Sequence, residues 1–434
     1  MNVSVSVEPG EKRVSWVELY FDLIFAFAVG ETTHVMVAAP NWSGFGHALG
    51  LFLPLWWTWI GFVVLYNRNP EDKVSQRLFV LVGTLPCAVA AVETHDAASG
   101  QGVAFALALA AARLILAVAF AFTSEHGKKV AIGYGVSTVV FAASAWVPTP
   151  WRHVLWAFAL IQEAGFLLLR NGERNRERSG DRAGGRTRRT RAEALRAMLQ
   201  PPADPARRVD AAHLAERFGL IMIILLGEVV VSVGASAVEI PGHDPRYWVG
   251  LLAGLVLAGA LWWVYFAAAA PLNEYVLRAS GGNPAMAYGI YAGGHLTPAF
   301  ALLTISAGVT LTLSGGTPRA AAWLITGGLA AYLAGSQALP TDPLPRFGRT
   351  LRAAIIPVTV CLGFLRPAIS TTGVVVAAAV WASAIAAYAT WRTPARLQVI
   401  KADPMTYFRS APQAEPRPGF NEADRPGETS PRSG

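Results

Sequence analysis

Long apolar runs dominate the chain from residue 14 to residue 391, and short polar segments separate them. Each run is long enough for an α-helix to cross a hydrocarbon core of roughly 30 Å. The runs do not alternate between apolar and polar residues, which excludes a membrane β-barrel and favours helices that satisfy their own backbone hydrogen bonds. The pattern predicts an all-α polytopic membrane protein with twelve transmembrane helices, over residues 14–37, 47–66, 77–96, 102–122, 128–147, 151–170, 213–237, 247–270, 285–312, 319–338, 351–368 and 371–391.

Composition supports this interpretation. Of the 434 residues, 53% are hydrophobic and 15% are charged, which argues against two or three soluble domains. The first apolar run follows Glu11, Lys12 and Arg13 and shows no small-residue cleavage pattern, so we expect it to remain as a helix. The two cysteines, Cys87 and Cys361, both fall within apolar runs and indicate neither a disulfide framework nor a zinc site.

Polar segments divide the chain into five parts. We predict a cytoplasmic leader, a first six-helix repeat, an Arg-rich cytoplasmic linker, a second six-helix repeat and a disordered cytoplasmic tail, over residues 1–13, 14–170, 171–212, 213–391 and 392–434. The tail is rich in Pro, Arg, Glu and Ser and lacks apolar periodicity.

Lysine and arginine in the short loops predict the orientation, because these residues stay on the cytoplasmic side. With the N-terminus inside, the inner segments hold eleven of them: Lys12, Arg13, Arg68, Lys73, Arg77, Lys128, Lys129, Arg278, Arg346, Arg349 and Arg352. The outer loops hold four: Arg152, Arg246, Arg319 and Arg366. An even number of spans then places both ends in the cytoplasm.

The linker is strongly basic. Residues 170–210 contain twelve arginines and six acidic residues, a surplus of six that supplies most of the net charge of +8. This surplus can fix the topology and act as a solvated tether, or it can bind anionic lipid headgroups. We do not expect nucleic-acid binding, because aromatic residues do not interleave with the basic ones.

The two halves share short segments in the same order, which predicts an internal repeat. The matching pairs are residues 18–31 with 216–228, 55–57 with 261–263, and 83–86 with 294–298. Six spans separate the copies, so the halves have the same orientation. Many secondary transporters are built from such parallel repeats, with the substrate site at the repeat interface.

Two segments carry a resemblance to a known family. The run WVELYFDLIFAFAV at residues 16–29, followed by His34, resembles the opening signature of the bacterial low temperature requirement A family. The run HLAERFGL at residues 213–220, followed by LGE at 226–228, resembles its second signature. The resemblance extends over about residues 14–391 and implies a multi-span bacterial inner-membrane protein, with no reaction or substrate attached. At Glu31 the sequence departs from the family pattern, where glutamine is usual.

Ionisable residues inside apolar runs are the candidate functional residues, because each is costly to insert in a membrane. They concentrate in the first helix of each half. The substrate- or proton-binding candidates are Glu18, Asp22, Glu31, His34, Glu93, Arg113, Glu216, Arg217, Glu228 and His295. Asp22 and Glu31 point to nearly opposite sides of an unbroken helix, so we expect that helix to lie inside the bundle or to bend near Gly30.

Each candidate has a structural and a functional interpretation. Arg113 requires a carboxylate partner, for which Glu93, Glu31 and Glu163 are available. His213, Glu216 and Arg217 either cap and anchor a helix at a hydrated boundary or bind substrate. His295 either bonds to a neighbouring helix or relays protons. The tryptophans at 56, 57, 59, 262 and 263 either anchor helices at the interface or line a pocket.

The spacing of Glu31 and His34 is that of di-metal sites in helix bundles. The second half does not repeat it, so we predict no metal and no cofactor. Phosphate-binding loops and hydrolase motifs are also missing from the sequence.

Two functions remain open. The first is a proton-coupled or facilitative transporter of a small organic solute, with Glu31 and Glu228 as titrating carboxylates and Arg113 as their countercharge. The second is an intramembrane enzyme that acts on a lipophilic substrate and uses Glu31, His34, Glu93 and Arg113 for acid–base chemistry, with or without a metal. A third possibility is a structural protein that supports the membrane in the cold.

Overall fold

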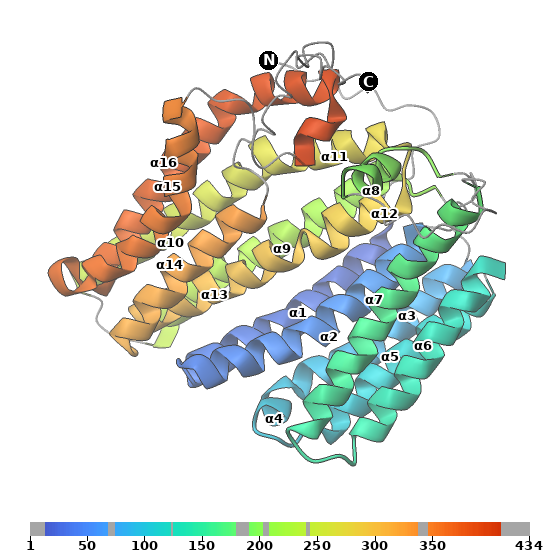
Figure 1. Cartoon of the computed structure of the whole chain (residues 1–434). Helices are drawn as coiled ribbons and strands as arrows, with labels where there is room; N and C mark the ends of the chain where they lie inside the picture. Colours follow the sequence, from blue (N-terminus) through green and yellow to red (C-terminus); the bar gives the residue numbers. More distant parts are fainter. Residues whose placement is uncertain are drawn as a thin grey trace, which may run out of the picture.

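The computed structural model describes residues 14–67, 74–122, 125–178, 191–202, 208–239, 244–336 and 346–408. All regular secondary structure in these ranges is helical, and none of it is strand. Two groups of helices lie side by side, with the blue-to-green helices α1 to α7 in one group and the yellow-green-to-red helices from α9 onward in the other (Figure 1).

The first group contains α1 (Trp16–Ala38), α2 (Trp42–Asn67), α3 (Val74–Val92), α4 (Thr94–Ala98), α5 (Val103–Ala121), α6 (Glu125–Ser144) and α7 (Trp151–Arg178). The short α8 (Arg191–Met198) follows. The second group contains α9 (Ala211–Glu239), α10 (Pro245–Val264), α11 (Ala270–Ala279), α12 (Pro284–Ala287), α13 (Leu296–Leu313), α14 (Pro318–Gly335), α15 (Arg346–Cys361) and α16 (Arg366–Ala402). Two π-helical segments, η2 (Tyr265–Ala269) and η3 (Tyr288–Gly293), and two 3₁₀ segments, η4 (Leu362–Leu365) and η5 (Pro404–Phe408), complete the described helices.

Seven helical segments within the described residues are long and apolar enough to cross a membrane. They are Trp16–Ala38, Trp42–Asn67, Val103–Ala121, Ala211–Gly234, Pro245–Ala279, Pro284–Leu313 and Ala353–Ala402. Each of the twelve predicted ranges overlaps a described helix. The structure therefore shows a helical protein with several candidate spans, and the count of twelve stays a prediction.

Local sequence explains where several helices begin. Ser15 caps α1, and its backbone N–H and hydroxyl donate to Oε2 of Glu18 at 2.9 and 3.0 Å. Asp244 caps α10 by accepting from the N–H of Tyr247 at 2.8 Å, with a proline in the first turn. These capping side chains satisfy N–H groups that have no partner inside the helix.

The last described helix continues beyond its expected end. We predicted that residues 392–434 form a disordered tail, but α16 continues to Ala402, and Arg396 and Ile400 on its extension are buried. The buried face of this extension gives it the packing that a solvated tail would lack. The leader at 1–13, the rest of the tail at 409–434 and much of the linker (179–190 and 203–207) lie outside the described residues.

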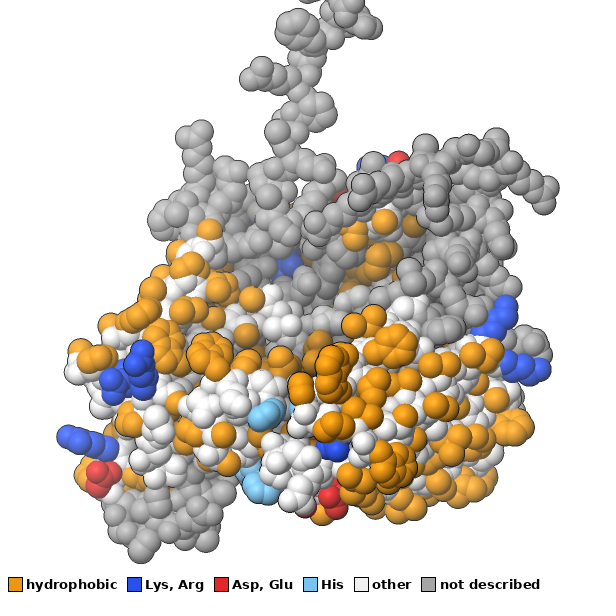
Figure 2. Space-filling view, turned by 60° about the horizontal axis from the view of Figure 1, so that its bottom comes forward, with side chains coloured by type: hydrophobic (Ala, Val, Ile, Leu, Met, Phe, Trp, Pro, Cys, Tyr) orange, Lys and Arg blue, Asp and Glu red, His pale blue; other side chains and the backbone are white. Residues whose placement is uncertain are grey.

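The two helical groups meet where α1 and α2 contact α9 and α13. Trp56 and Trp59 of α2 are fully buried there and pack together with Phe25 and Phe218. In addition to the apolar core, apolar side chains cover much of the described surface in the view of Figure 2. That distribution is typical of a protein whose surrounding solvent is hydrocarbon.

Our expectation for the first helix was wrong in one respect. The helix runs unbroken past Gly30, yet Tyr20, Leu23 and Phe27 form an exposed stripe along it. Only the opposite face, which carries Glu18 and Asp22, is buried. One side of α1 therefore faces outward while the other faces the second helical group.

Candidate functional site

Arg217 of α9 lies between two acidic side chains of α1. Its Nη1 is 2.6 Å from Oε1 of Glu18, and its Nη2 donates to Oδ1 of Asp22 at 2.6 Å. All three side chains are buried, with exposed fractions of at most 2%. The signature-bearing helices of the two halves are thus joined by a buried ionic contact between residues 195 positions apart.

His213 completes this ionic cluster one turn before Arg217 on α9. Its Nε2 is 3.0 Å from Oε1 of Glu18, and its Nδ1 is 3.0 Å from Nδ2 of Asn67. We define the α1–α9 cluster as Glu18, Asp22, His213 and Arg217. The sequence left open whether His213 and Arg217 anchor a helix at a hydrated boundary or bind substrate. The boundary interpretation is wrong for these two residues, because both are buried.

Asn67 orients the imidazole of His213. Its Oδ1 accepts from the backbone N–H of Asp210 at 3.2 Å, and its Nδ2 donates to the carbonyl of Asp210 at 3.0 Å. This double contact forces Nδ2, a donor, toward Nδ1 of His213. Nδ1 of the imidazole therefore faces a donor, and Nε2 faces Oε1 of Glu18 at 3.0 Å.

Charge counting then shows an imbalance. In the form that accepts at Nδ1, His213 is neutral, and the cluster then contains two carboxylates and one guanidinium, one excess negative charge unless a proton binds. Asp22 Oδ1 accepts from Arg217 and from Nε1 of Trp59 at 2.8 Å. Asp22 Oδ2 is buried and has no hydrogen-bond partner among the described residues. An unpaired charge is costly in a low-dielectric interior, and Oδ2 is the atom at which one proton removes it.

A second polar group lies further along the same two helices. Glu31 and His34 are 3.6 Å apart and continue the outward stripe of α1, with side-chain exposures of 25% and 67%. Glu228 of α9 is half-buried against Gly30, and it interacts electrostatically with both of them. Glu31 and Glu228 are therefore brought together as predicted, but at a partly open position.

Arg113 has a different partner from the one the transport hypothesis required. Its Nε donates to Oε1 of Glu163 at 2.7 Å and its Nη1 donates to Thr58 at 2.9 Å, while its guanidinium lies 4.1 Å from the ring of Phe141. Glu163 is one of the three partners proposed from sequence. The role of Arg113 as countercharge to Glu31 and Glu228 is wrong, because its charge is already paired on α7.

Glu93 and Glu216 lie outside both the α1–α9 cluster and the polar group of Glu31, His34 and Glu228. Glu93 is half-buried between α3 and α4, and His95 and Asp96 beside it are exposed. Glu216 is exposed and accepts from the N–H of Val14 at 3.2 Å. Across the described residues, no three or more His, Cys, Asp or Glu side chains are grouped so that they could hold a metal ion.

His295 is buried beside the two π-helical segments. Its Nδ1 is 3.0 Å from the carbonyl of Ile290, and its Nε2 is 2.8 Å from the hydroxyl of Tyr265. Trp56 donates to the carbonyl of Ala292 in η3 at 3.0 Å. The contact with Tyr265 shows that His295 is hydrogen-bonded to a neighbouring helical segment. Tyr265 and Asn67 were not singled out from sequence, because Tyr265 is a lone polar group inside an apolar run and Asn67 directly follows one.

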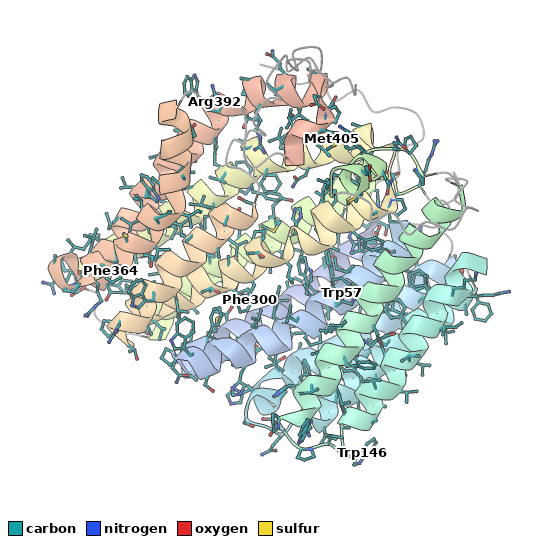
Figure 3. All side chains as sticks on the ribbon, in the orientation of Figure 1. Trp57, Trp146, Phe300, Phe364, Arg392 and Met405 are labelled. Atoms are coloured by element: carbon teal, nitrogen blue, oxygen red, sulfur yellow. The ribbon has the colours of Figure 1, made fainter. Side chains whose placement is uncertain are left out.

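The tryptophans of the two halves have different environments. Trp56 and Trp59 are fully buried, whereas Trp262 and Trp263 are 42% and 50% exposed. Trp57, labelled in Figure 3, is partly buried on α2. In the first half, Trp56 and Trp59 donate hydrogen bonds within the core, so anchoring at the interface does not account for them.

Comparison with known proteins gives one family match. The family model described as Bacterial low temperature requirement A protein (LtrA) matches residues 13–392. An uncharacterized protein of Rhizobium meliloti (strain 1021) is 23% identical over 269 residues, which are 59% of this chain and 59% of that protein. No solved structure matches the chain significantly.

Proposed function

The chain belongs to the bacterial low temperature requirement A family, a family of membrane proteins, and from this premise we propose that it is a proton-coupled transporter of a small organic solute. The observation that carries the proposal is the charge imbalance of the α1–α9 cluster. A buried site that is neutral only with one proton bound is a proton-binding site.

The proposed architecture is twelve spans in two parallel six-helix repeats, with both ends in the cytoplasm of a bacterial inner membrane. The contact between α1 and α9 supports it, because these helices carry the matching segments of the two halves. In parallel-repeat transporters, the interface between repeats is where movement and ligand binding occur. A proton site at this position would couple protonation to the movement of one half against the other.

The proposed coupling step is a proton transfer on Asp22. With Oδ2 protonated, Glu18 and Arg217 form a neutral pair and the cluster holds the two halves together. Loss of that proton leaves a second carboxylate beside Arg217, and the excess charge favours a state in which the interface opens to water. Glu31 lies nine residues or about 13 Å beyond Asp22 along α1. Together with its neighbours His34 and Glu228 of α9, it would then exchange protons with the outer side.

The enzyme alternative has less support. It placed Glu31, His34, Glu93 and Arg113 around one lipophilic substrate, and acid–base groups must lie within hydrogen-bond reach of that substrate. Arg113 instead pairs with Glu163, and Glu93 lies beside α4.

The test uses the full-length chain in proteoliposomes that contain a trapped pH-sensitive dye. Pools of amino acids, carboxylic acids, sugars and nucleosides are added outside, and a proton-coupled transporter changes the internal pH with one of these pools. Asp22→Asn should abolish this pH change and retain exchange of the same labelled solute across the membrane. The amide reproduces the shape of a protonated carboxyl group but cannot release its proton.

Glu274→Gln is the matched control, because Glu274 forms an exposed pair with Arg278 at 2.9 Å. It should leave both solute flux and the pH change unaltered. Solute flux without any pH change in the unmodified protein would contradict proton coupling. A full pH change in Asp22→Asn would remove Asp22 as the site.

A further inference from the structure

A large groove opens between the two helical groups, away from the α1–α9 cluster. Its walls are the start of α2 and the length of α14, and α13 forms its floor. Its volume is about 630 Å³, within the range of sites that hold an organic ligand. We call it the α2–α14 groove, and none of the four cluster residues lines it.

Polarity changes along the groove. At one end lie Asn41, Thr317 and Arg319, which are all exposed. The body of the groove is apolar, and its floor includes Phe300, which packs between Phe45 and Phe52 of α2 at centroid distances of 5.4 and 5.2 Å (Figure 3). Arg319 is the one charged side chain among the described residues that line the groove.

The length of the groove matches one leaflet of a bilayer. Its lining on α14 extends from Arg319 to Ala331, twelve residues or roughly 18 Å of helix rise. A single leaflet contributes about 15 Å, half of the hydrocarbon thickness. Trp42 is 88% exposed at the polar end, where aromatic side chains commonly mark the membrane–water interface.

We propose that the α2–α14 groove binds an anionic phospholipid, with its phosphate on Arg319 and one acyl chain along α13 and α14. Charge complementarity selects this occupant. The apolar body matches an acyl chain, and a single cation at the interfacial end favours a headgroup with net negative charge over a zwitterionic one. Arg319 stands at the start of α14, where the helix N-terminus adds to its attraction for phosphate.

Two neighbouring glycines provide a precise way to fill the groove. A side chain at Gly327 would enter open space, since no described atom lies within 4 Å of its Cβ position. At Gly328 the Cβ position is 2.8 Å from Ile305, so a side chain there would disrupt packing against α13. Gly327→Leu therefore blocks the groove without disturbing the helix contact. Gly259→Leu, on the exposed face of α10 with open space around it, is the matched control.

The experiment measures lipid binding to the full-length protein by native mass spectrometry, after delipidation and addition of equimolar phosphatidylglycerol and phosphatidylcholine. The unmodified protein and Gly259→Leu should retain one phosphatidylglycerol with a preference over phosphatidylcholine. Arg319→Gln should lower that preference about fivefold, the effect of one interfacial charge. Gly327→Leu should retain about tenfold less phosphatidylglycerol, because the leucine side chain occupies the position of the acyl chain.

Several outcomes would overturn the proposal. Equal retention of the two lipids by the unmodified protein would show a general lipid surface with no headgroup selection. An unchanged preference in Arg319→Gln would remove the phosphate site, and this exposed variant tests the proposal even where Gly327→Leu fails to fold. Equal loss in Gly327→Leu and Gly259→Leu would show that the lipid binds elsewhere. Transport measurements are not involved, so failure here is separate from failure of proton coupling.

Discussion

Two buried arginines, Arg113 and Arg217, show how differently the same residue can be used in one protein. Arg113 pairs with one carboxylate, Glu163, and both belong to the first group of helices. Arg217 faces two carboxylates and joins the two groups. One site is electrically balanced and the other is not.

The surroundings of the two guanidinium groups also differ between the balanced site of Arg113 and the unbalanced site of Arg217. Arg113 also donates to Thr58 and lies over the ring of Phe141, so its site is packed and locally complete. At Arg217 the Nε atom and Oδ2 of Asp22 are buried without hydrogen-bond partners in the described structure. A balanced pair fixes the packing of helices, whereas an unbalanced one has a state that a proton can change.

The largest effect should come from Glu163→Gln. The amide leaves the Arg113 guanidinium buried without a countercharge, which is expected to lower the free energy of unfolding by about 3–5 kcal/mol. Reversible unfolding in mixed micelles of a mild detergent and SDS measures this change in the free energy of unfolding. The double change Arg113→Met with Glu163→Leu should recover most of the loss, and an unchanged stability in Glu163→Gln would show that the pair is not structural.

Asn67→Ala should have an intermediate effect. The change removes both contacts with the backbone of Asp210 and leaves Nδ1 of His213 buried without a donor. We expect the free energy of unfolding to fall by about 1–2 kcal/mol, measured in the same micelles. An unaltered value would mean that the amide does not hold the imidazole in its neutral form.

Asp22→Asn should change stability by less than about 1 kcal/mol, and in the stabilising direction. This is the same carboxyl-to-amide change as Glu163→Gln, but here the amide keeps the cluster neutral without a bound proton, whereas in Glu163→Gln it leaves a buried charge unpaired. Comparing the two amide variants by unfolding therefore tests the charge imbalance directly. A loss of several kcal/mol in Asp22→Asn would show that the aspartate is ionised and required for packing.

Glu274→Gln should have the smallest effect. The pair with Arg278 is exposed, and such pairs contribute about 0–1 kcal/mol. The free energy of unfolding should stay within about 0.5 kcal/mol of the unmodified protein. A larger fall in the free energy of unfolding would indicate that burial does not explain why the Arg113–Glu163 pair contributes more than the Glu274–Arg278 pair.

Much of the helical organisation could be predicted from sequence, because apolar runs of membrane length have few alternatives. The predicted break between residues 368 and 371 even coincides with a non-helical residue, Ser370, which has a positive φ of 66°. The π-helical segments were not predicted, because a single extra residue in a helix leaves no mark in an apolar run. The continuation of α16 past residue 391 was missed because its buried face comes from long-range packing.

The sequence predicted which residues belong to the candidate site better than it predicted which of them pair with one another. Glu18, Asp22 and Arg217 were selected because charge is costly in apolar runs, and they prove to lie together. Local spacing could not show that Arg217 lies opposite Asp22, 195 residues away, nor choose among three carboxylates for Arg113. His213 was assigned to a hydrated boundary because its position near the start of a helix conceals its contact with α1.

The segment η3 (Tyr288–Gly293) makes the second half tolerant of a change in chain length at one point. A π-helical turn accommodates one residue more than an α-helical turn. Deleting one residue there would restore regular α-helical winding, and the helix that follows would keep its orientation because the wider turn is what absorbs the extra residue. His295 would still face Tyr265, and Phe300 would stay on the floor of the groove. When relatives of this chain are aligned, a one-residue gap at this position therefore marks a regular turn in place of the π-helical one, with the same side chains facing the protein interior.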